Sequence, residues 1–134
     1  MMLNNSSWEL EFFDEAKNWR KYQFENVLKY INFSVLEVGP GTGNNVQYYR
    51  DRASEITLLE IDKHMANSLK FKFEEDKKVM VQNSDIYSQE RKFDTILYMD
   101  VLEHIEDDEK ETNKIIRAIS KTTHLTNDIK NEYL

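Results

Sequence analysis

The sequence of 134 residues predicts an α/β fold, in which helices cover both faces of a parallel sheet. Short apolar segments alternate with segments of helical spacing, and this alternation is typical of a parallel sheet. All three glycines and the only proline fall between residues 39 and 43, directly after the first apolar segment. A glycine-rich turn at that point, where the sheet binds its ligands, indicates a Rossmann-like architecture.

The elements follow in order along the chain. An amphipathic helix is expected from about residue 12 to 31, because Phe24, Val27, Leu28 and Ile31 recur at helical spacing. Apolar segments rich in β-branched and aromatic residues predict buried strands at 33–38 and 56–61. Two further strands are expected at 79–82 and 93–98. Helices are expected at 44–52, at 63–75 after an N-cap at Asp62, and from Asp107 or Asp108 to about 121. The strand at 93–98 is expected to lack a partner on one side.

Charge and composition exclude several classes of function. With 18 Lys and Arg against 25 Asp and Glu, the formal net charge of -7 predicts no binding to nucleic acid or to an anionic membrane surface. The absence of cysteine excludes disulfides, thiolate zinc sites and cysteine nucleophiles. No segment is apolar enough to insert into a membrane, and no signal-peptide pattern opens the chain, so a cytoplasmic protein is expected. His64 and His124 have no partner at metal-binding spacing, so no metal site is expected.

The glycine turn alone leaves two chemistries open. A dinucleotide-binding turn reads G-x-G-x-x-G, and Gly39 and Gly41 fit its first two positions, but Asn44 occupies the third. An NAD-dependent oxidoreductase is therefore disfavoured but stays open. Glu60 lies 21 residues after Gly39, near the spacing expected for an acid that binds a ribose in either case.

Four motifs resemble those of class I S-adenosylmethionine-dependent methyltransferases. VLEVGPGTG at 35–43 resembles the family's glycine motif, and LLEID at 58–62 resembles its second-strand acidic motif. NSDIYS at 83–88 resembles the loop that contacts adenine, and FDTILYMDVLEHIEDDEKE at 93–111 resembles the fourth strand and the segment after it. The likeness implies a class I methyltransferase fold, S-adenosylmethionine as the cofactor, and methyl transfer. A narrower likeness to methyltransferases found beside sugar-transfer genes implies a small-molecule, saccharide or lipid-linked acceptor.

The resemblance also implies which residues form the site. Glu60 would bind the ribose diol and Asp85 the adenine amino group. Acids in the cleft, Glu37 and Asp100, would favour the cationic sulfonium and repel a pyrophosphate. His104 is a candidate general base, with a hydrogen-bonded structural histidine as the alternative. The expected cofactor-binding residues are Glu37, Gly39, Gly41, Gly43, Glu60, Ile61, Asp85, Ile86 and Asp100.

Two of these acids also have structural interpretations. Glu37 could hold the glycine loop by accepting hydrogen bonds from backbone N–H groups, which is compatible with a role in binding. Asp85 could form an ordinary Asx-turn within its own loop. The sequence leaves both interpretations open.

A single domain spanning residues 1–134 is expected, with a cofactor-binding core at about 33–121 and a tail at 122–134. Because no Gly or Pro follows Gly43, the family's fifth strand and final hairpin are expected to be missing. Two hypotheses follow. The chain is a methyltransferase that acts alone, as a homodimer or with a protein covering the open sheet edge, or it is a catalytically inactive partner subunit or binding module.

Overall fold

The computed structural model describes residues 7–99, 110 and 113–114, with side chains from residue 16 onward. The chain divides into two compact units, Met1–Tyr30 and Ile31–Leu134. In the first unit, the helix α1 runs over Ser7–Val27 and is followed by a 3-10 turn, η1, at Leu28–Tyr30. The helix therefore begins earlier than the predicted residue 12, and its predicted end is a tighter turn. That one domain spans residues 1–134 stays a prediction.

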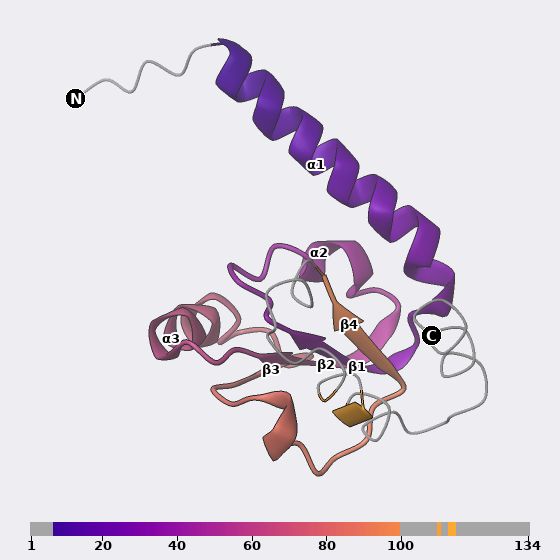
Figure 1. The fold of residues 1–134 in the computed structure, drawn as a ribbon, viewed down its shortest axis with the longest axis vertical. Helices are drawn as coiled ribbons and strands as arrows, with labels where there is room; N and C mark the ends of the chain where they lie inside the picture. The colour runs from indigo at the N-terminus through magenta and orange to yellow at the C-terminus, as the bar shows by residue number, and fades with distance from the viewer. Residues whose placement is uncertain (1–6, 100–109, 111–112, 115–134) are drawn as a thin grey trace. The chain divides into compact units, whose positions relative to one another are not determined.

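The second unit contains a four-stranded parallel sheet with the order β3-β2-β1-β4 (Figure 1). The strands are β1 Phe33–Val38, β2 Ala53–Leu59, β3 Val79–Gln82 and β4 Thr95–Tyr98. This sheet confirms the predicted fold class. The bounds of β1 and β3 are those predicted, whereas β2 begins three residues early, because Ala53 pairs with Phe33 across an irregularity at the start of β1.

Helices and turns connect the strands. The helices are α2 at Val46–Tyr49 and α3 at Lys63–Lys72, both shorter than predicted. Asp62 caps α3 as expected, since its Oδ1 accepts a hydrogen bond from the Met65 amide at 2.9 Å. The connections from β1 to β2 to β3 run in one direction, so right-handed crossovers place α2 and α3 on one face of the sheet. The connection to β4 reverses direction and carries the 3-10 turn η2 at Ile86–Ser88 on the opposite face (Figure 1).

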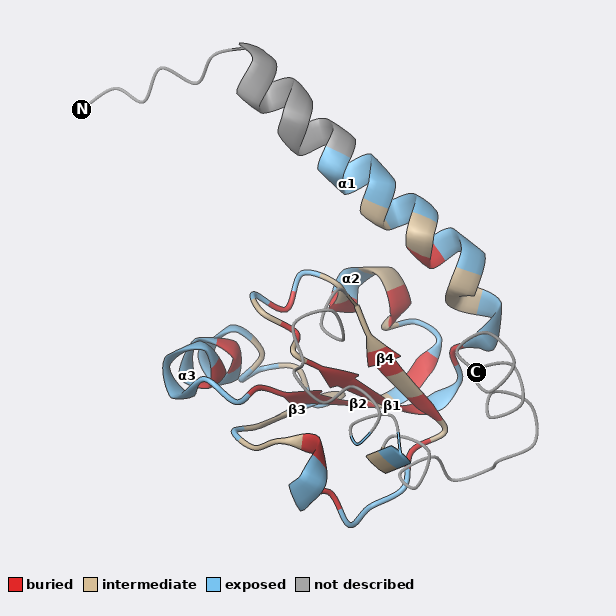
Figure 2. Cartoon of the chain, viewed as in Figure 1, coloured by how far each residue is buried: buried red, intermediate tan, exposed pale blue. Residues whose placement is uncertain are grey.

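The core lies on both faces of β1, whose residues after Phe33 are all buried (Figure 2). On the face that η2 covers, one cluster joins Leu36, Val38, Leu59, Ile86 and Phe93. Alternate residues of a strand point to opposite faces, so Val35 and Glu37 point toward α2 and α3. A buried acid is therefore part of the face that carries the two helices.

Within the described residues, β4 is an edge strand that pairs only with β1, as predicted. Its start is fixed by side chains: Asp94 Oδ2 accepts hydrogen bonds from the Ser34 amide at 3.1 Å and the Ser34 hydroxyl at 2.7 Å. The Thr95 hydroxyl also bonds both backbone groups of Asn32. These contacts fix the register of β4 against β1. The predicted helix after Asp107 lies outside the described residues, apart from residues 110, 113 and 114.

Candidate functional site

Three loops meet at the carboxyl edge of the sheet, and backbone hydrogen bonds join them. The glycine loop follows β1, and the Gly39 amide donates to the carbonyl of Leu59 at 3.0 Å. Glu60 follows β2, and its amide donates to the carbonyl of Gln82 at 3.0 Å. Asn83 follows β3, and its Nδ2 donates to the carbonyls of Glu60 and Ile61, both at 2.9 Å. The residues predicted to bind a cofactor from these loops are therefore neighbours, at the edge where parallel sheets bind ligands.

The three glycines of the loop all have positive φ, at 68° for Gly39, 59° for Gly41 and 79° for Gly43. These values are unfavourable for residues with a Cβ. Gly43 also needs to be small, because an added Cβ would lie 2.7 Å from Phe73 Cε2 and 2.8 Å from Leu69 Cδ2. At Gly41, an added Cβ would meet only Met65 Cε, at 3.9 Å, among the described residues. Gly43 thus packs against α3, while Gly41 leaves the loop open to close approach.

Glu37 is only 1% exposed, and it connects β1 to α2. Its Oε1 accepts a hydrogen bond from Asn45 Nδ2 at 2.8 Å, and its Oε2 accepts one from the Tyr49 hydroxyl at 2.6 Å. Burial raises the pKa of Tyr49 far above its ordinary value, and the neighbouring carboxylate of Glu37 raises it further. Glu37 therefore has a structural role, in which side chains of Asn45 and Tyr49 join it to α2 and to the residue before this helix. That Glu37 accepts hydrogen bonds from backbone N–H groups of the glycine loop stays a prediction. Direct binding of a ligand by Glu37 stays a prediction.

Glu60 is a buried acid that uses one of its two carboxylate oxygens within the described part of the chain. The residue is 6% exposed, and its Oε2 accepts the amide of Asp62 at 3.0 Å. Among the residues that the structure describes, no donor bonds its second oxygen, Oε1. Ile61, next in the chain, is 74% exposed, which is unusual for so apolar a side chain. A carboxylate oxygen of Glu60 that can accept a hydrogen bond and the exposed apolar side chain of Ile61 thus belong to consecutive residues at this edge.

The remaining predicted residues differ in their placement. Asp85 Oδ1 accepts hydrogen bonds from the Ser88 amide at 3.1 Å and the Ser88 hydroxyl at 2.9 Å. The side chain therefore caps the 3-10 turn η2, with a bond to the third residue rather than the bond to the second residue that an Asx-turn makes. The side chain of Ile86 belongs to the core, so any contact between Ile86 and a ligand would have to come from its backbone. Asp100 and His104 lie outside the described residues.

Sequence reasoning missed three residues that organise this edge, namely Asn45, Tyr49 and Asn83. The signal for the first two was the acid inside an apolar strand, because a buried carboxylate requires donors. Asn83 directly follows β3 at the carboxyl edge, a position that could have marked it as a link between the loops.

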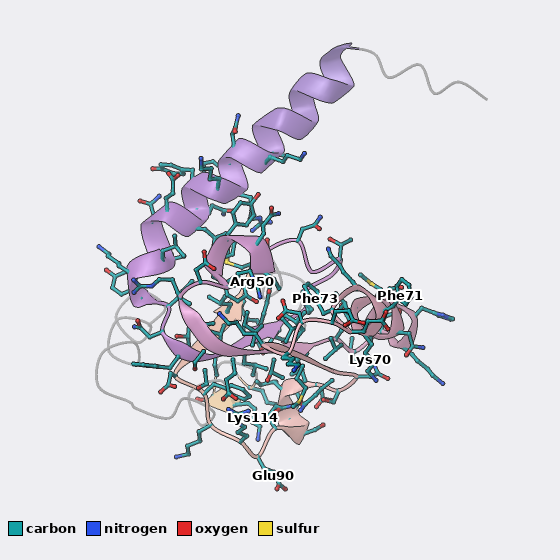
Figure 3. All side chains as sticks on the ribbon, turned by 180° about the vertical axis from the view of Figure 1, so that it is seen from behind. Arg50, Lys70, Phe71, Phe73, Glu90 and Lys114 are labelled. Atoms are coloured by element: carbon teal, nitrogen blue, oxygen red, sulfur yellow. The ribbon has the colours of Figure 1, made fainter. Side chains whose placement is uncertain are left out.

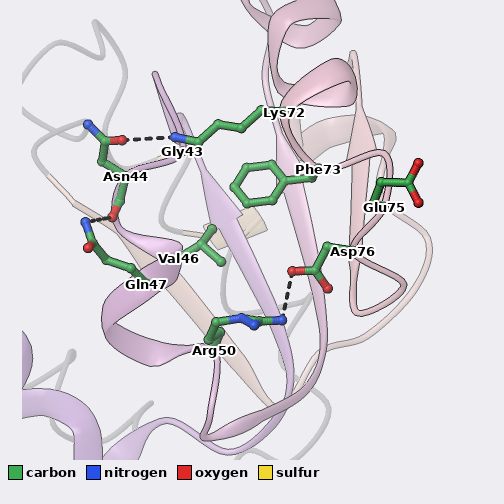
Figure 4. Close-up of a pocket in the computed structure, with 9 residues that line it drawn as sticks. All are labelled: Gly43, Asn44, Val46, Gln47, Arg50, Lys72, Phe73, Glu75 and Asp76. Atoms are coloured by element: carbon green, nitrogen blue, oxygen red, sulfur yellow. Dashed lines mark hydrogen bonds and ion pairs between the residues drawn. The ribbon is translucent and has the colours of Figure 1, made fainter.

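A cleft of about 690 Å³ lies between α2 and α3 (Figure 4). Glu60, Ile61 and Asp85 are not among the residues that line it. Three of the four charged side chains that line the cleft bond other protein groups: Arg50 pairs with Asp76 at 2.8 Å, and Lys72 bonds the glycine loop. Its lining residues are Gly43, Asn44, Val46, Gln47, Arg50, Lys72, Phe73, Glu75 and Asp76. The chemistry of the carboxyl edge, rather than this cleft, identifies the candidate site.

Comparison with known proteins gives a family and a set of similar folds. The model of the ribosomal RNA adenine dimethylase family matches residues 24–132. A comparison with curated proteins gave no match. The structure of the YcgJ protein from Bacillus subtilis is similar with a TM-score of 0.66 and 17% identity, over 78% of this chain and 47% of that one.

Two further structures have the same fold. The 23S rRNA methyltransferase ErmE aligns with a TM-score of 0.57 and 23% identity, over 75% of this chain and 41% of ErmE. The N-methyltransferase NodS from Bradyrhizobium japonicum WM9, in complex with S-adenosyl-L-homocysteine, aligns with a TM-score of 0.66 and 16% identity, over 88% of this chain and 60% of NodS. The chain therefore spans less than two thirds of the length of each of these three proteins.

The family match contradicts the prediction that nucleic acid is not a partner, because the matching family is named for its action on ribosomal RNA. The prediction relied on the net charge, which is a sum over the chain and does not describe how charges are distributed. From Lys17 to Lys29, for example, four basic residues accompany a single acid, Glu25. Within the described part of the chain, no helix combines the length and the apolar character needed to cross a membrane.

Proposed function

Because the chain belongs to the ribosomal RNA adenine dimethylase family of S-adenosylmethionine-dependent methyltransferases, we propose that it binds S-adenosylmethionine and serves in methyl transfer to an adenine of ribosomal RNA. Family membership confirms the resemblance seen in the sequence motifs. The match over residues 24–132 carries the proposal. It replaces the small-molecule or saccharide acceptor expected from the narrower likeness. The cytoplasmic location stays part of the proposal.

The carboxyl edge of the sheet has groups that suit this cofactor. Oε1 of Glu60 can accept hydrogen bonds from ribose hydroxyls, which are donors. The exposed side chain of Ile61 can cover a face of the flat adenine ring. Gly41 has room for close approach to the loop backbone. The acids Glu37 and Glu60 favour a cation at this edge.

When bound, S-adenosylmethionine supplies a methyl group activated by a positively charged sulfur. The chain's own residues would hold the cofactor-binding groups in fixed positions. The network of Glu37, Asn45 and Tyr49 fixes the glycine loop, while the Asp62 amide and Asn83 hold Glu60 and its carbonyl. Such fixed geometry can supply a large part of the acceleration of a displacement reaction. Roles for Asp85, Asp100 and His104 remain proposals that follow from the motifs.

Calorimetric titration with S-adenosylhomocysteine and S-adenosylmethionine tests cofactor binding. We expect micromolar affinity for the wild-type chain and a loss of at least about tenfold for Glu60→Gln, roughly the contribution of a hydrogen bond to a charged group. Glu74→Gln is the matched control, because Glu74 is an exposed acid just after α3. Absence of binding by a chain that circular dichroism shows to be folded would contradict the proposal and favour the inactive binding module.

Transfer of a tritiated methyl group tests the acceptor. Total ribosomal RNA is incubated with the chain and labelled S-adenosylmethionine, digested to nucleosides and separated. We expect the label in methylated adenosine, with Glu60→Gln as the control that loses it. Cofactor binding without label in adenosine would reject ribosomal RNA adenine as the acceptor of this chain.

A further inference from the structure

The C-terminal turn of α3 contacts the glycine loop in two ways, through hydrogen bonds and through apolar packing. The Nζ of Lys72 lies 2.9 Å from the carbonyl oxygen of Thr42. It also lies 3.0 Å from Oδ1 of Asn44 (Figure 4). Beside these bonds, Leu69 and Phe73 fill the space where a Cβ of Gly43 would lie. One turn of a helix thus supplies both a polar and an apolar contact to the loop.

The bond from Lys72 fixes a particular peptide unit. In a trans peptide the carbonyl and the next N–H point in opposite directions within one plane. The carbonyl of Thr42 accepts from Lys72, and the amide of Gly43, in the same unit, donates to the carbonyl of Pro40 at 3.0 Å. Rotation of this peptide would break both bonds at once. The orientation of the loop backbone between Thr42 and Gly43 is therefore held from both sides.

The same helix reaches the other principal element of the site. At its N-terminus, Asp62 caps α3 and donates its amide to Glu60 Oε2. At its C-terminus, ten residues later, Lys72 holds the glycine loop. Helix α3 thus connects the acid and the loop that the proposed function assigns to the cofactor.

We propose that Lys72 is a positioning residue, which holds the Thr42–Gly43 peptide in the orientation that binds the cofactor. The inference rests on the proposed function for its cofactor part and on the hydrogen bonds for its loop part. The other explanation for a basic residue here is a general one, since cations stabilise the last turn of any helix. Lys70 lies in that same turn and would share such an effect (Figure 3).

The test compares Lys72→Met, Lys72→Arg and the control Lys70→Met in the full chain. Hydrogen exchange at the Gly43 amide reports on the loop, S-adenosylhomocysteine titration on affinity, and the melting temperature on overall stability. For Lys72→Met we expect at least threefold faster exchange and a Kd raised three- to tenfold, with a melting temperature close to that of Lys70→Met. Lys72→Arg should restore part of the slow exchange at Gly43 and part of the affinity for S-adenosylhomocysteine, since arginine can donate to the same oxygens.

Each outcome is decisive. If Lys72→Met and Lys70→Met have the same rate of hydrogen exchange at the Gly43 amide and the same Kd for S-adenosylhomocysteine, Lys72 acts only on the helix and the inference is overturned. If wild-type chain fails to bind S-adenosylhomocysteine, the proposed function and the cofactor part of the inference fail together. In that case exchange at Gly43 still decides whether Lys72 holds the loop.

Discussion

The hydrogen bond between Tyr49 and Glu37 gives the sharpest test of how the site is built. Tyr49→Phe removes one hydroxyl, which donates to Oε2 of Glu37 at 2.6 Å, and leaves the aromatic ring in place. Both residues are at most 1% exposed, so water cannot easily replace the lost donor. The substitution therefore removes the hydrogen bond from the Tyr49 hydroxyl to Glu37 and changes little of the packing volume.

The expected cost is about 1.5–3 kcal/mol of the free energy of unfolding, the range for hydrogen bonds to charged groups. The upper end is not exceeded, because Asn45 still donates to the other oxygen of Glu37. The loss would be a large fraction of the stability of an ordinary domain. It should also loosen the end of α2, where Tyr49 is the last helical residue.

Urea denaturation at pH 7, followed by circular dichroism, measures this cost. Tyr30→Phe is the matched control, because Tyr30 is 56% exposed and its substitution should change stability by less than about 0.5 kcal/mol. A Tyr49→Phe variant as stable as the control would refute the view that Glu37 depends on this bond.

Three further predictions concern other parts of the fold. Because the pKa of Tyr49 is raised in the folded state, the unfolded chain loses the phenol proton at a lower pH than the folded chain does. The free energy of unfolding of the wild type should therefore fall above pH 10.0, by up to about 1.4 kcal/mol per pH unit. Urea titrations between pH 9 and 11 should show the difference in free energy of unfolding between wild type and Tyr49→Phe becoming smaller as the pH rises. Gly43→Ala should cost about 2–5 kcal/mol, from its positive φ and the clash with α3; a melting temperature equal to that of wild type would contradict this. Asp94→Ala should cost about 1–2 kcal/mol in urea, because Ser34 loses its acceptor at the start of β4; a change below about 0.3 kcal/mol would count against that role.

Local patterns in the sequence were sufficient for the strands and for the loop between β1 and α2. A parallel strand inside a sheet is buried on both faces, so β1 stands out as a short apolar segment with definite ends. The bounds of β3 were also predicted from its β-branched residues, although this edge strand has no buried residue. The concentration of glycine at 39–43 reflects local backbone demands, and the positive φ of all three glycines agrees with it. Asp62 was identifiable because capping depends only on the next three residues.

Quantities that depend on the whole surface were poorly predicted. The net charge of -7 pointed away from nucleic acid, whereas the family match points to ribosomal RNA. A sum of charges contains no information about position, and contacts with phosphates depend on local arrangement.

The predicted end of the helix at 44–52 was also wrong, because the chain after Tyr49 turns early to begin β2 at Ala53.

The sequence by itself determined the parallel α/β sheet, the glycine loop, the acid Glu37 within β1 and the acid Glu60 after β2, because these depend on residue type and near neighbours. Only the tertiary structure decided what each of these groups contacts. Glu37 bonds Tyr49, and Lys72 reaches back 30 residues to Thr42, because crossover packing brings α2 and α3 against the loop. Hydrogen bonds require distances near 3 Å, and a sequence fixes no such distance between residues that are far apart along the chain.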